Sequence, residues 1–293
     1  MTSLFKDRAI QHEFDSKGYV VIPFLSRSEV AEVSSVYASL QFESAVPKLS
    51  SVITERPVLA RRIREEFNRI AAVAIDRHFA PCDLILGNFL IKQPNPAGVT
   101  PPHQDWTMID EASVSAGVAW VPLVDVDLEN GAMGVLPGSR RLFSDVCCAP
   151  SAFAYRLLPY AAYAMDLLPY LDFRVLKAGE ALVFGAGGVH GSLPNKTPDP
   201  RIVATFSLAP RGTRFRLPYL LPNSDLSKFE MFEFGVNDFV EYDNSRLTNL
   251  FEQGARPDLK SLGVFDFRPT RISAAEAIHW IEDAGCRKRA DLP

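Results

Sequence analysis

The period of the apolar residues changes near residue 84, and this change limits the folds that the chain can adopt. Between residues 84 and 209, short apolar runs rich in β-branched and aromatic residues are separated by Gly, Pro, Asn and Asp. Runs of this kind predict the strands of an antiparallel sandwich or barrel. They lie at 84–91, 116–124, 132–138, 180–185 and 201–209. The pair Asn130-Gly131 also predicts a hairpin turn between two of these strands.

The residues before this region predict one strand and two helices. Residues 19–25 form a short apolar run, and Ser26 with Glu29 matches the capping box that opens an amphipathic helix. A second helix is expected to begin near Thr54 with Pro57 in its first turn. Apolar residues recur there at spacings of three and four, so this helix should bury one face.

The rest of the chain is less regular. Residues 143–173 are aromatic and interrupted by prolines, and we interpret them as an insertion that covers the mouth of the barrel. Residues 220–270 lack a clear period, so they are predicted to form loops and short helices. Ser273 and Glu276 match another capping box, and Gly285 predicts the end of the last helix.

We expect one domain that spans residues 1–293. Its parts would be N-terminal helices at 26–80, a β core at about 84–210, a lid-like insertion at 143–173 and a C-terminal extension at 211–293. A chain of 293 residues, of which 47% are hydrophobic, can bury a core of this size.

The charge and the cysteines exclude several classes of function. The 31 basic and 35 acidic residues leave a net charge of -4, which gives no general attraction for nucleic acid or an anionic membrane. Four cysteines without a CxxC pair favour a reducing compartment over a disulfide framework. No stretch matches a signal peptide or the roughly 18 apolar residues of a membrane span. We expect a soluble cytoplasmic protein, a monomer or homodimer, that acts on a small molecule.

The chemistry is predicted from His103, Asp105 and His190. A His-x-Asp pair with a distant histidine is the ligand set of a non-haem iron site, in which one face of an octahedral Fe(II) stays open for a co-substrate and O2. On a strand, residues two apart point to the same side, so His103 and Asp105 can reach one metal while Gln104 points away. The prolines at 101–102 place the motif at a strand start or a barrel rim.

Arg201 lies eleven residues after His190, on the next apolar run. If the strands at these two residues form a hairpin, their side chains share a face, with Cβ atoms roughly 4.5–5.5 Å apart. A guanidinium is the preferred partner of a carboxylate, because it binds both oxygens and keeps its charge. A 2-oxo dicarboxylic acid could then chelate the iron at one end and place its far carboxylate on Arg201.

Together these segments resemble the Fe(II)/2-oxoglutarate oxygenases and, within them, the phytanoyl-CoA dioxygenase-like family. The matching parts are His103-Gln104-Asp105, the strand of Trp120, NGAMGVLPGS at 130–139, AGEALVFGAGGVHGSLPN at 178–195, and Arg201. The resemblance covers roughly residues 15–210. It implies a fold that is mainly β with flanking helices, a double-stranded β-helix (jelly roll, cupin-like).

The same resemblance implies the roles of individual residues. The three ligands named above would bind Fe(II), Arg201 and Ser192 would hold the distal carboxylate of 2-oxoglutarate, and Trp120 would line the co-substrate pocket. The reaction would use O2, release succinate and CO2, and hydroxylate or otherwise oxidise an unactivated C–H bond of a small organic molecule. Intermediates of natural-product biosynthesis are among the expected substrates. Halogenating relatives lack the carboxylate ligand, so Asp105 argues against halogenation.

Two other functions remain open at this point. A zinc- or other metal-dependent lyase or hydrolase would use the same three ligands but would not need Arg201. A non-catalytic jelly-roll binding protein could keep the ligands without turnover. For substrate contacts, Trp106 and Met108 directly follow the motif, and Arg211 with Arg214 could anchor an anionic group.

Overall fold

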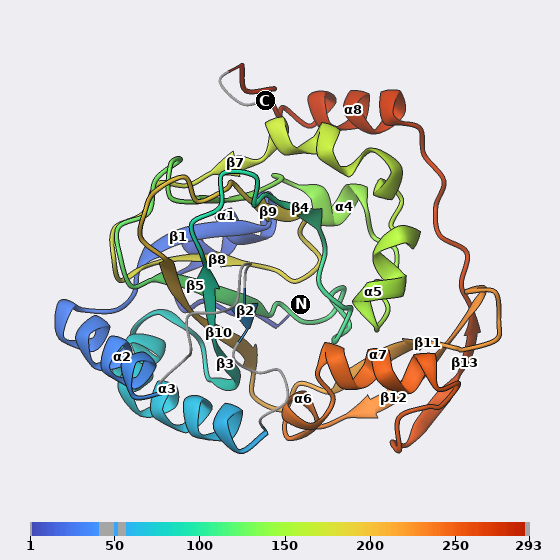
Figure 1. Cartoon of the computed structure of the whole chain (residues 1–293), viewed down its shortest axis with the longest axis horizontal. Coiled ribbons are helices and arrows are strands. Elements are labelled where there is room, and N and C mark those ends of the chain that lie inside the picture. The colour runs from blue at the N-terminus through green and yellow to red at the C-terminus, as the bar shows by residue number, and fades with distance from the viewer. Residues whose placement is uncertain (1, 41–49, 52–56, 291–293) are drawn as a thin grey trace.

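Two antiparallel sheets lie face to face at the centre of the computed structural model, which describes residues 2–40, 50–51 and 57–290 (Figure 1). The larger sheet has the order β1 (Tyr19–Pro23), β8 (Glu180–Phe184), β5 (Gly117–Pro122), β10 (Arg201–Pro210), β3 (Cys82–Lys92) and β2 (Ser50–Ser51). The smaller sheet has the order β4 (Thr100–His103), β9 (His190–Ser192), β6 (Met133–Val135) and β7 (Asp172–Phe173). The predicted double-stranded β-helix is confirmed, and its larger sheet also recruits β1, which precedes the predicted core.

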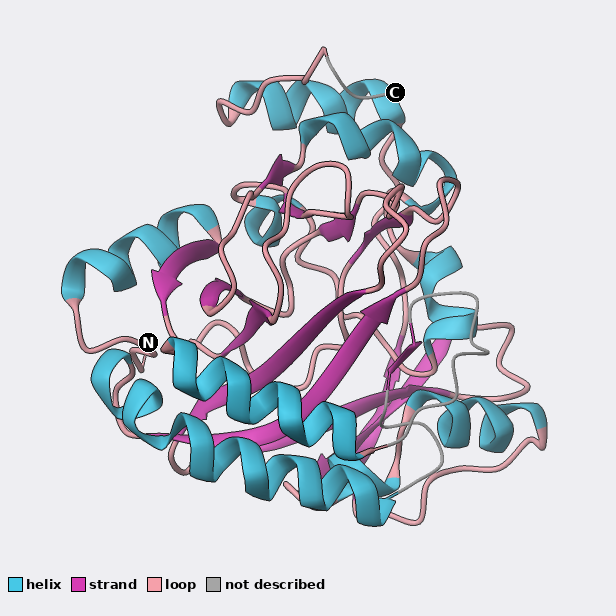
Figure 2. Cartoon of the chain, turned by 60° about the vertical axis from the view of Figure 1, so that its left-hand side comes forward, coloured by secondary structure: helices cyan, strands magenta, loops and turns pink. Residues whose placement is uncertain are grey.

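The larger sheet is buried on both faces, and alternate residues of its strands serve the two sides. On β5, Trp120 points into the core between the sheets, whereas Ala119 and Val121 point to the opposite core beneath the helices. Helices α2 (Arg27–Ser39) and α3 (Pro57–His78) cover that outer face, and Figure 2 shows two long helices side by side that cross the strands of the sheet. The larger sheet is therefore packed on both faces, against the helices on one side and the smaller sheet on the other.

Local sequence signals account for the start of each N-terminal helix. Asp7 accepts two backbone N–H groups at the start of α1 (Arg8–Lys17), and Ser26 with Glu29 forms the predicted capping box of α2. Helix α3 starts at Pro57, a residue suited to a first turn. Thr54, where we expected this helix to begin, lies outside the described residues.

Two predicted hairpins are wrong, and both errors have the same cause. Residues Asn130 and Gly131 do form a turn, but the turn connects β5 of the larger sheet to β6 of the smaller one. The segment after His190 likewise connects β9 to β10, which lie in different sheets, so His190 and Arg201 are not cross-strand neighbours. In a double-stranded β-helix the chain repeatedly crosses between sheets, and turn chemistry alone does not distinguish a crossing from a hairpin.

The segment at 143–173 mostly packs under the smaller sheet. It is preceded by α4 (Ser139–Leu142) and contains α5 (Ser151–Ala154), η1 (Tyr155–Leu157) and η2 (Ala161–Tyr170). Apolar side chains of η2 belong to the same buried cluster as Trp120 and Met133, and α8 (Ala274–Asp283) packs on η2 from outside. The capping box at Ser273 and the positive φ of Gly285 agree with the predicted bounds of α8.

The prediction of loops and short helices for 220–270 is wrong in part. Beyond Pro210 the chain forms a separate sheet of β11 (Phe215–Leu220), β12 (Lys228–Phe234) and β13 (Ser261–Asp266), with α6 (Asp238–Glu241) and α7 (Asn244–Glu252) beside it (Figure 1). Strand β12 shows no alternation because adjacent residues 229–232 are all buried, including Glu230 in an ion pair with Arg256. Strand β13 is exposed at most positions, so it lacks a buried face although it carries apolar side chains. Among the described residues, no helix has the length and hydrophobicity needed to cross a bilayer.

Candidate metal centre and its cavity

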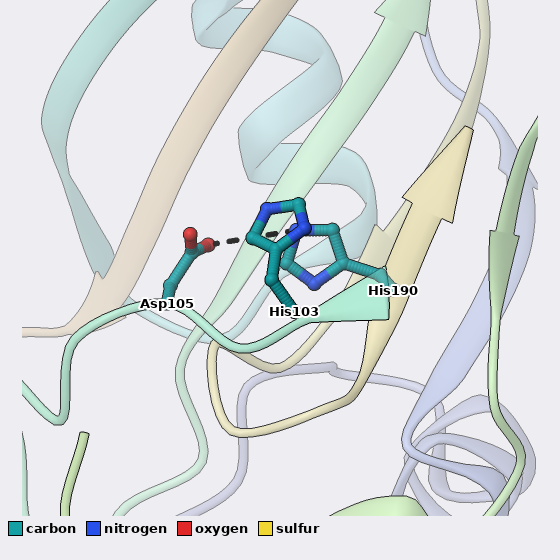
Figure 3. A group of neighbouring side chains, drawn as sticks. All are labelled: His103, Asp105 and His190. Atoms are coloured by element: carbon teal, nitrogen blue, oxygen red, sulfur yellow. Dashed lines mark ion pairs between the residues drawn. The ribbon is translucent and has the colours of Figure 1, made fainter. Parts of the chain in front are cut away.

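The three predicted ligands converge from two neighbouring strands of the smaller sheet. His103 is the last residue of β4, His190 is the first of β9, and the two are paired in register. Asp105 follows on the loop after β4, and Figure 3 shows its carboxylate directed toward the imidazoles. Strand β4 lies at the edge of its sheet, as Pro101 and Pro102 require, since neither can donate a ladder hydrogen bond.

The donor atoms of these three side chains fit a single divalent metal ion. The ligand atoms all lie within 4.8 Å of one another, and His190 Nε2 is 4.0 Å from Asp105 Oδ2. Each histidine has its Nδ1 next to a backbone carbonyl, at 2.8 Å from Pro101 O and 3.0 Å from Gly188 O. A carbonyl only accepts, so each Nδ1 carries the proton and each Nε2 lone pair remains for the metal.

Burial and the neighbouring rings keep His103 neutral. Burial lowers the pKa of His103 to about 4, and proximity to His190 adds to this effect. The His190 ring lies between His103, at a centroid distance of 4.3 Å, and Phe184, at 4.6 Å. A neutral, sterically fixed imidazole is the form that binds a metal.

Gln104, between the two ligands of the motif, points away from the metal as predicted. Its Nε2 donates to Phe143 O at 2.9 Å and to Gly187 O at 2.7 Å, and its Oε1 accepts from Tyr160 at 3.1 Å. The side chain is only 2% exposed. Gln104 therefore ties the HxD motif to the insertion and to the loop that precedes His190.

A cavity of about 520 Å³ passes the three ligands and continues on both sides of them. One end is buried and is bounded by side chains of the two sheets, namely Thr100, Trp120, Met133, Ser192 and Arg201. The other end reaches the surface at Asn244, which is exposed. We call the first end the inner chamber and the second the outer chamber.

Arg201 occupies the inner chamber, although not by the predicted route. Arg201 lies on the same face of β10 as Val203 and Thr205, and this face is directed toward the smaller sheet. The guanidinium lies 4.9 Å from the centre of the Trp120 ring and donates through Nη1 to Gly131 O. It is 2% exposed, its Nε has no hydrogen-bond partner, and it forms no ion pair with any described residue.

A second buried cation, which the sequence analysis missed, lies beside Arg201. Lys92 is its register partner on β3, is 3% exposed, and forms no ion pair within the described part of the chain. Its Nζ donates to Ser192 Oγ and Leu193 O, and Ser192 Oγ in turn lies 3.0 Å from Thr100 Oγ1. Burial, with the nearby charge of Arg201, lowers the pKa of Lys92 to about 7. The alternation of β3 was the available signal, because it places Lys92 on the same face as Asn88 and Leu90.

This inner chamber is suited to an anion. Burying a cation without a carboxylate partner costs several kcal/mol of desolvation free energy, and here two cations are buried in this way. An anion that enters the chamber offsets part of this free energy. Burial also lowers the pKa of Arg201, to about 9. The unpartnered Nε of Arg201 and the hydroxyls of Ser192 and Thr100 offer donors that a carboxylate can accept from.

The predicted substrate contacts divide into two groups. Trp106 and Met108 line the outer chamber, and Trp106 Nε1 donates to Ser151 Oγ at 2.9 Å. Arg211 and Arg214 do not line the cavity. The Arg211 side chain is 72% exposed and lies 3.5 Å from Asp83 on β3, so the predicted anionic anchor is not found there.

Sequence reasoning also missed one wall of the outer chamber. Phe215, Phe234, Phe239 and Tyr242 come from the sheet and helices that follow Pro210. Seven aromatic residues between positions 215 and 242 give a compositional signal, but without a period they do not identify a shared face. From the insertion at 143–173, Ser151 and Tyr155 reach the cavity.

Comparisons with known proteins concern the fold and the family of the chain. A comparison with curated protein sequences gave no significant match. EvdO2 from Micromonospora carbonacea var. aurantiaca has a similar structure, with a TM-score of 0.50 and 22% identity over 71% of this chain and 93% of that one. Two further structures have TM-scores of 0.48. They are the non-heme alpha ketoglutarate dependent epimerase SnoN from nogalamycin biosynthesis (23% identity, 71% and 83% covered) and HygX from Streptomyces hygroscopicus with nickel and 2-oxoglutarate bound (18%, 70% and 88%).

The sequence profile named Phytanoyl-CoA dioxygenase (PhyH) matches residues 14–203, which is well over half of the chain. That range contains the three converging ligands, Arg201 and Lys92. The chain therefore belongs to the phytanoyl-CoA dioxygenase family.

Proposed function

We propose that this protein is an Fe(II)- and 2-oxoglutarate-dependent oxygenase that oxidises an unactivated C–H bond of a small organic molecule. Hydroxylation is the simplest form of that reaction, and natural-product intermediates are the expected substrates. The proposal is supported by the names of the structural relatives, which include a 2-oxoglutarate-dependent epimerase and a carbocyclase from one biosynthetic pathway.

One observation supports this function above the others, namely that an open metal site and an unpaired buried guanidinium share one cavity. A metal-dependent hydrolase needs the three ligands but has no use for Arg201 or Lys92. A binding protein without turnover would not need neutral imidazoles with free Nε2 lone pairs. A 2-oxo dicarboxylate uses all of these features, because one end chelates the metal and the other requires cations.

The roles of this chain's own residues follow from their positions. His103, Asp105 and His190 would hold Fe(II), which with 2-oxoglutarate supplies the activation of O2. Arg201 would bind the far carboxylate of 2-oxoglutarate, with its planar face held against Trp120. The apolar walls exclude water from the space between the metal and the substrate, so that oxidation is directed to the bound C–H bond.

Lys92 acts in this scheme through Ser192. Because its ammonium donates to Ser192 Oγ, the Ser192 hydroxyl keeps its own proton for an acceptor. That acceptor is Thr100 Oγ1 in this structure, and it would be the carboxylate of a bound 2-oxoglutarate. Lys92 is thus a positioning residue, and its charge adds to the field that attracts the anion.

The test is an anaerobic titration of the Fe(II)-loaded protein with 2-oxoglutarate, followed by visible absorption. A chelated 2-oxo acid should produce a metal-to-ligand charge-transfer band that saturates, and Arg201→Met should weaken the binding by about a hundredfold, which corresponds to about 3 kcal/mol for a charged hydrogen-bonded pair. The same variant should bind 2-oxovalerate, which lacks the far carboxylate, as well as the wild type does. A correctly folded wild-type protein that binds Fe(II) but shows no band would overturn the proposal. Succinate formation after O2 is admitted then separates turnover from binding alone.

A further inference from the structure

The outer chamber has an aromatic wall that the family match does not include. The profile ends at residue 203, whereas Phe215, Phe234, Phe239 and Tyr242 all follow it. Phe239 makes edge-to-face contacts with Phe215, at 5.2 Å and 88°, and with Phe234, at 4.9 Å and 70°. The rings therefore support one another and form a preordered apolar surface beyond the metal.

The charges that line the cavity are unevenly distributed. Among the described lining residues, Arg201 is the only arginine or lysine, and it lies at the buried inner end. The outer chamber instead contains the carboxylate of Asp243, which caps α7 by accepting the Arg246 N–H at 2.8 Å. An anionic substrate group placed there would meet a negative charge and no lining cation.

Two polar groups of the outer chamber already have partners within the protein. Ser151 Oγ accepts from Trp106 Nε1, and Asn244 Oδ1 accepts from the Ser151 N–H at 2.8 Å. A ligand with many hydroxyls would leave several of them without partners, at a cost of about 1–3 kcal/mol each. A flat apolar ring system would instead gain burial, and about 0.5–1.5 kcal/mol for each well-placed aromatic contact.

From these observations we infer that the substrate presents to the outer chamber an uncharged or cationic aromatic or polycyclic group that carries no carboxylate, phosphate or sulfonate. This inference rests on the proposed function for the identity of the site. It makes the segment after Pro210 the determinant of substrate class, while residues within the family match perform the reaction. It also replaces the sequence-based expectation of an anionic substrate held by Arg211 and Arg214.

Two probes that differ by one group test the inference. N-phenyl-1-naphthylamine is uncharged, and 8-anilino-1-naphthalenesulfonate has the same ring system with a sulfonate added. Both become fluorescent in apolar surroundings, so each can be titrated into the protein under anaerobic conditions, with and without Fe(II) and 2-oxoglutarate. The wild type should bind the uncharged probe at least tenfold more tightly, which corresponds to about 1.4 kcal/mol.

Variants of the wall identify where the probes bind. Phe239→Ala should weaken the uncharged probe about tenfold, and Phe239→Leu, which keeps an apolar side chain, should have a smaller effect in the same direction. Phe265→Ala is the matched control, because Phe265 is 47% exposed on β13 and does not line the cavity. Asp243→Asn keeps a good N-cap residue, so it should tighten the sulfonate probe while leaving the uncharged one unchanged.

Two results would overturn the inference. One is a sulfonate probe that binds as tightly as the uncharged probe and responds to Phe239→Ala. The other is an uncharged probe whose affinity neither Phe239 variant changes, although both proteins unfold as cooperatively as the wild type. Because the probes are also measured without metal, these results do not depend on the charge-transfer band, whose absence would instead count against the proposed function.

Discussion

Replacing Lys92 by methionine removes a buried cation, and the loss should change how the stability of the protein depends on pH. Lys92 is 3% exposed and has hydroxyl and carbonyl oxygens as its hydrogen-bond acceptors. The charged group that acts on Lys92 from the neighbouring strands is Arg201 on β10. Burial, together with this charge, lowers the pKa of Lys92 from 10.5 to about 7. Methionine has a similar length and no charge, so it isolates the electrostatic contribution.

The sign follows from proton binding. In the unfolded chain the lysine has its ordinary pKa, so between pH 7 and 10.5 the unfolded state binds more protons than the folded state. The contribution of Lys92 to stability is therefore lowest below pH 7 and increases as the pH rises through this window. One pKa unit corresponds to about 1.4 kcal/mol, so from pH 7 to pH 9 this residue should raise the free energy of unfolding by about 2 kcal/mol.

The assay is urea unfolding of the metal-free wild type and Lys92→Met at several values between about pH 7 and pH 9. Burial raises the pKa of Cys147 to about 12 and also raises that of Cys148, so these thiols oppose the trend near pH 9 in both proteins. The difference between wild type and variant removes their effect. Lys228→Met, at an exposed position of β12, controls for the loss of a lysine as such.

The same proton links Lys92 to the proposed co-substrate. An anion in the inner chamber favours the charged lysine, so 2-oxoglutarate should bind together with a proton at pH 8. Its affinity for the wild type should then fall by up to about tenfold per pH unit above pH 7, and the fall should be absent in Lys92→Met. If the stability difference between wild type and variant stays constant from pH 7 to 9, Lys92 is charged throughout and this reasoning is refuted.

Three further changes test other contacts around the site. Gln104→Leu leaves the carbonyls of Phe143 and Gly187 without their donor, so urea unfolding should show a loss of about 2–4 kcal/mol; an effect below about 0.5 kcal/mol would contradict its linking role. Gly131→Ala places a side chain at φ +98° with its Cβ 3.0 Å from Lys92 Cδ, so thermal unfolding should show a loss of about 1–3 kcal/mol, and an unchanged melting temperature would count against it. Ser192→Ala should weaken 2-oxoglutarate binding about tenfold in calorimetry while iron affinity is retained; equal losses of both would indicate a general structural defect instead.

The parts of the fold that could be predicted are those with short-range causes. The capping box of Ser26 and Glu29 fixes its helix start through contacts within three residues, and the HxD motif places two ligands two residues apart, at the end of β4 and on the loop that follows it. The arrangement of the strands has long-range causes. Turn residues such as Asn130 and Gly131 specify a local bend, but whether the next strand joins the same sheet depends on packing between sheets. For this reason the predicted hairpin between His190 and Arg201 is wrong, although Arg201 does lie beside the metal site as expected.

Lys92 shows a second limit. A lysine in a strand is usually exposed. The alternation of β3 indicates which face carries Lys92, but not that this face is closed by Ser192 and Leu193, about a hundred residues later. Its role requires three strands from two sheets to be in place. The same holds for Phe239, whose partners on β11 and β12 are brought together by a sheet with no regular apolar period.

These two limits divide the molecule in a way that bears on its function. The residues that hold the metal and the inner chamber are fixed by the jelly roll, and their spacing is constrained by strand geometry, so a sequence pattern detects them. One wall of the outer chamber comes from a segment that follows the last strand of the larger sheet, and none of the residues in this wall is a metal ligand. Selectivity can therefore change without loss of the reaction centre. Knowledge of the family consequently predicts the chemistry of this protein better than its substrate, which must be inferred from Phe215, Phe234, Phe239, Tyr242 and Asp243.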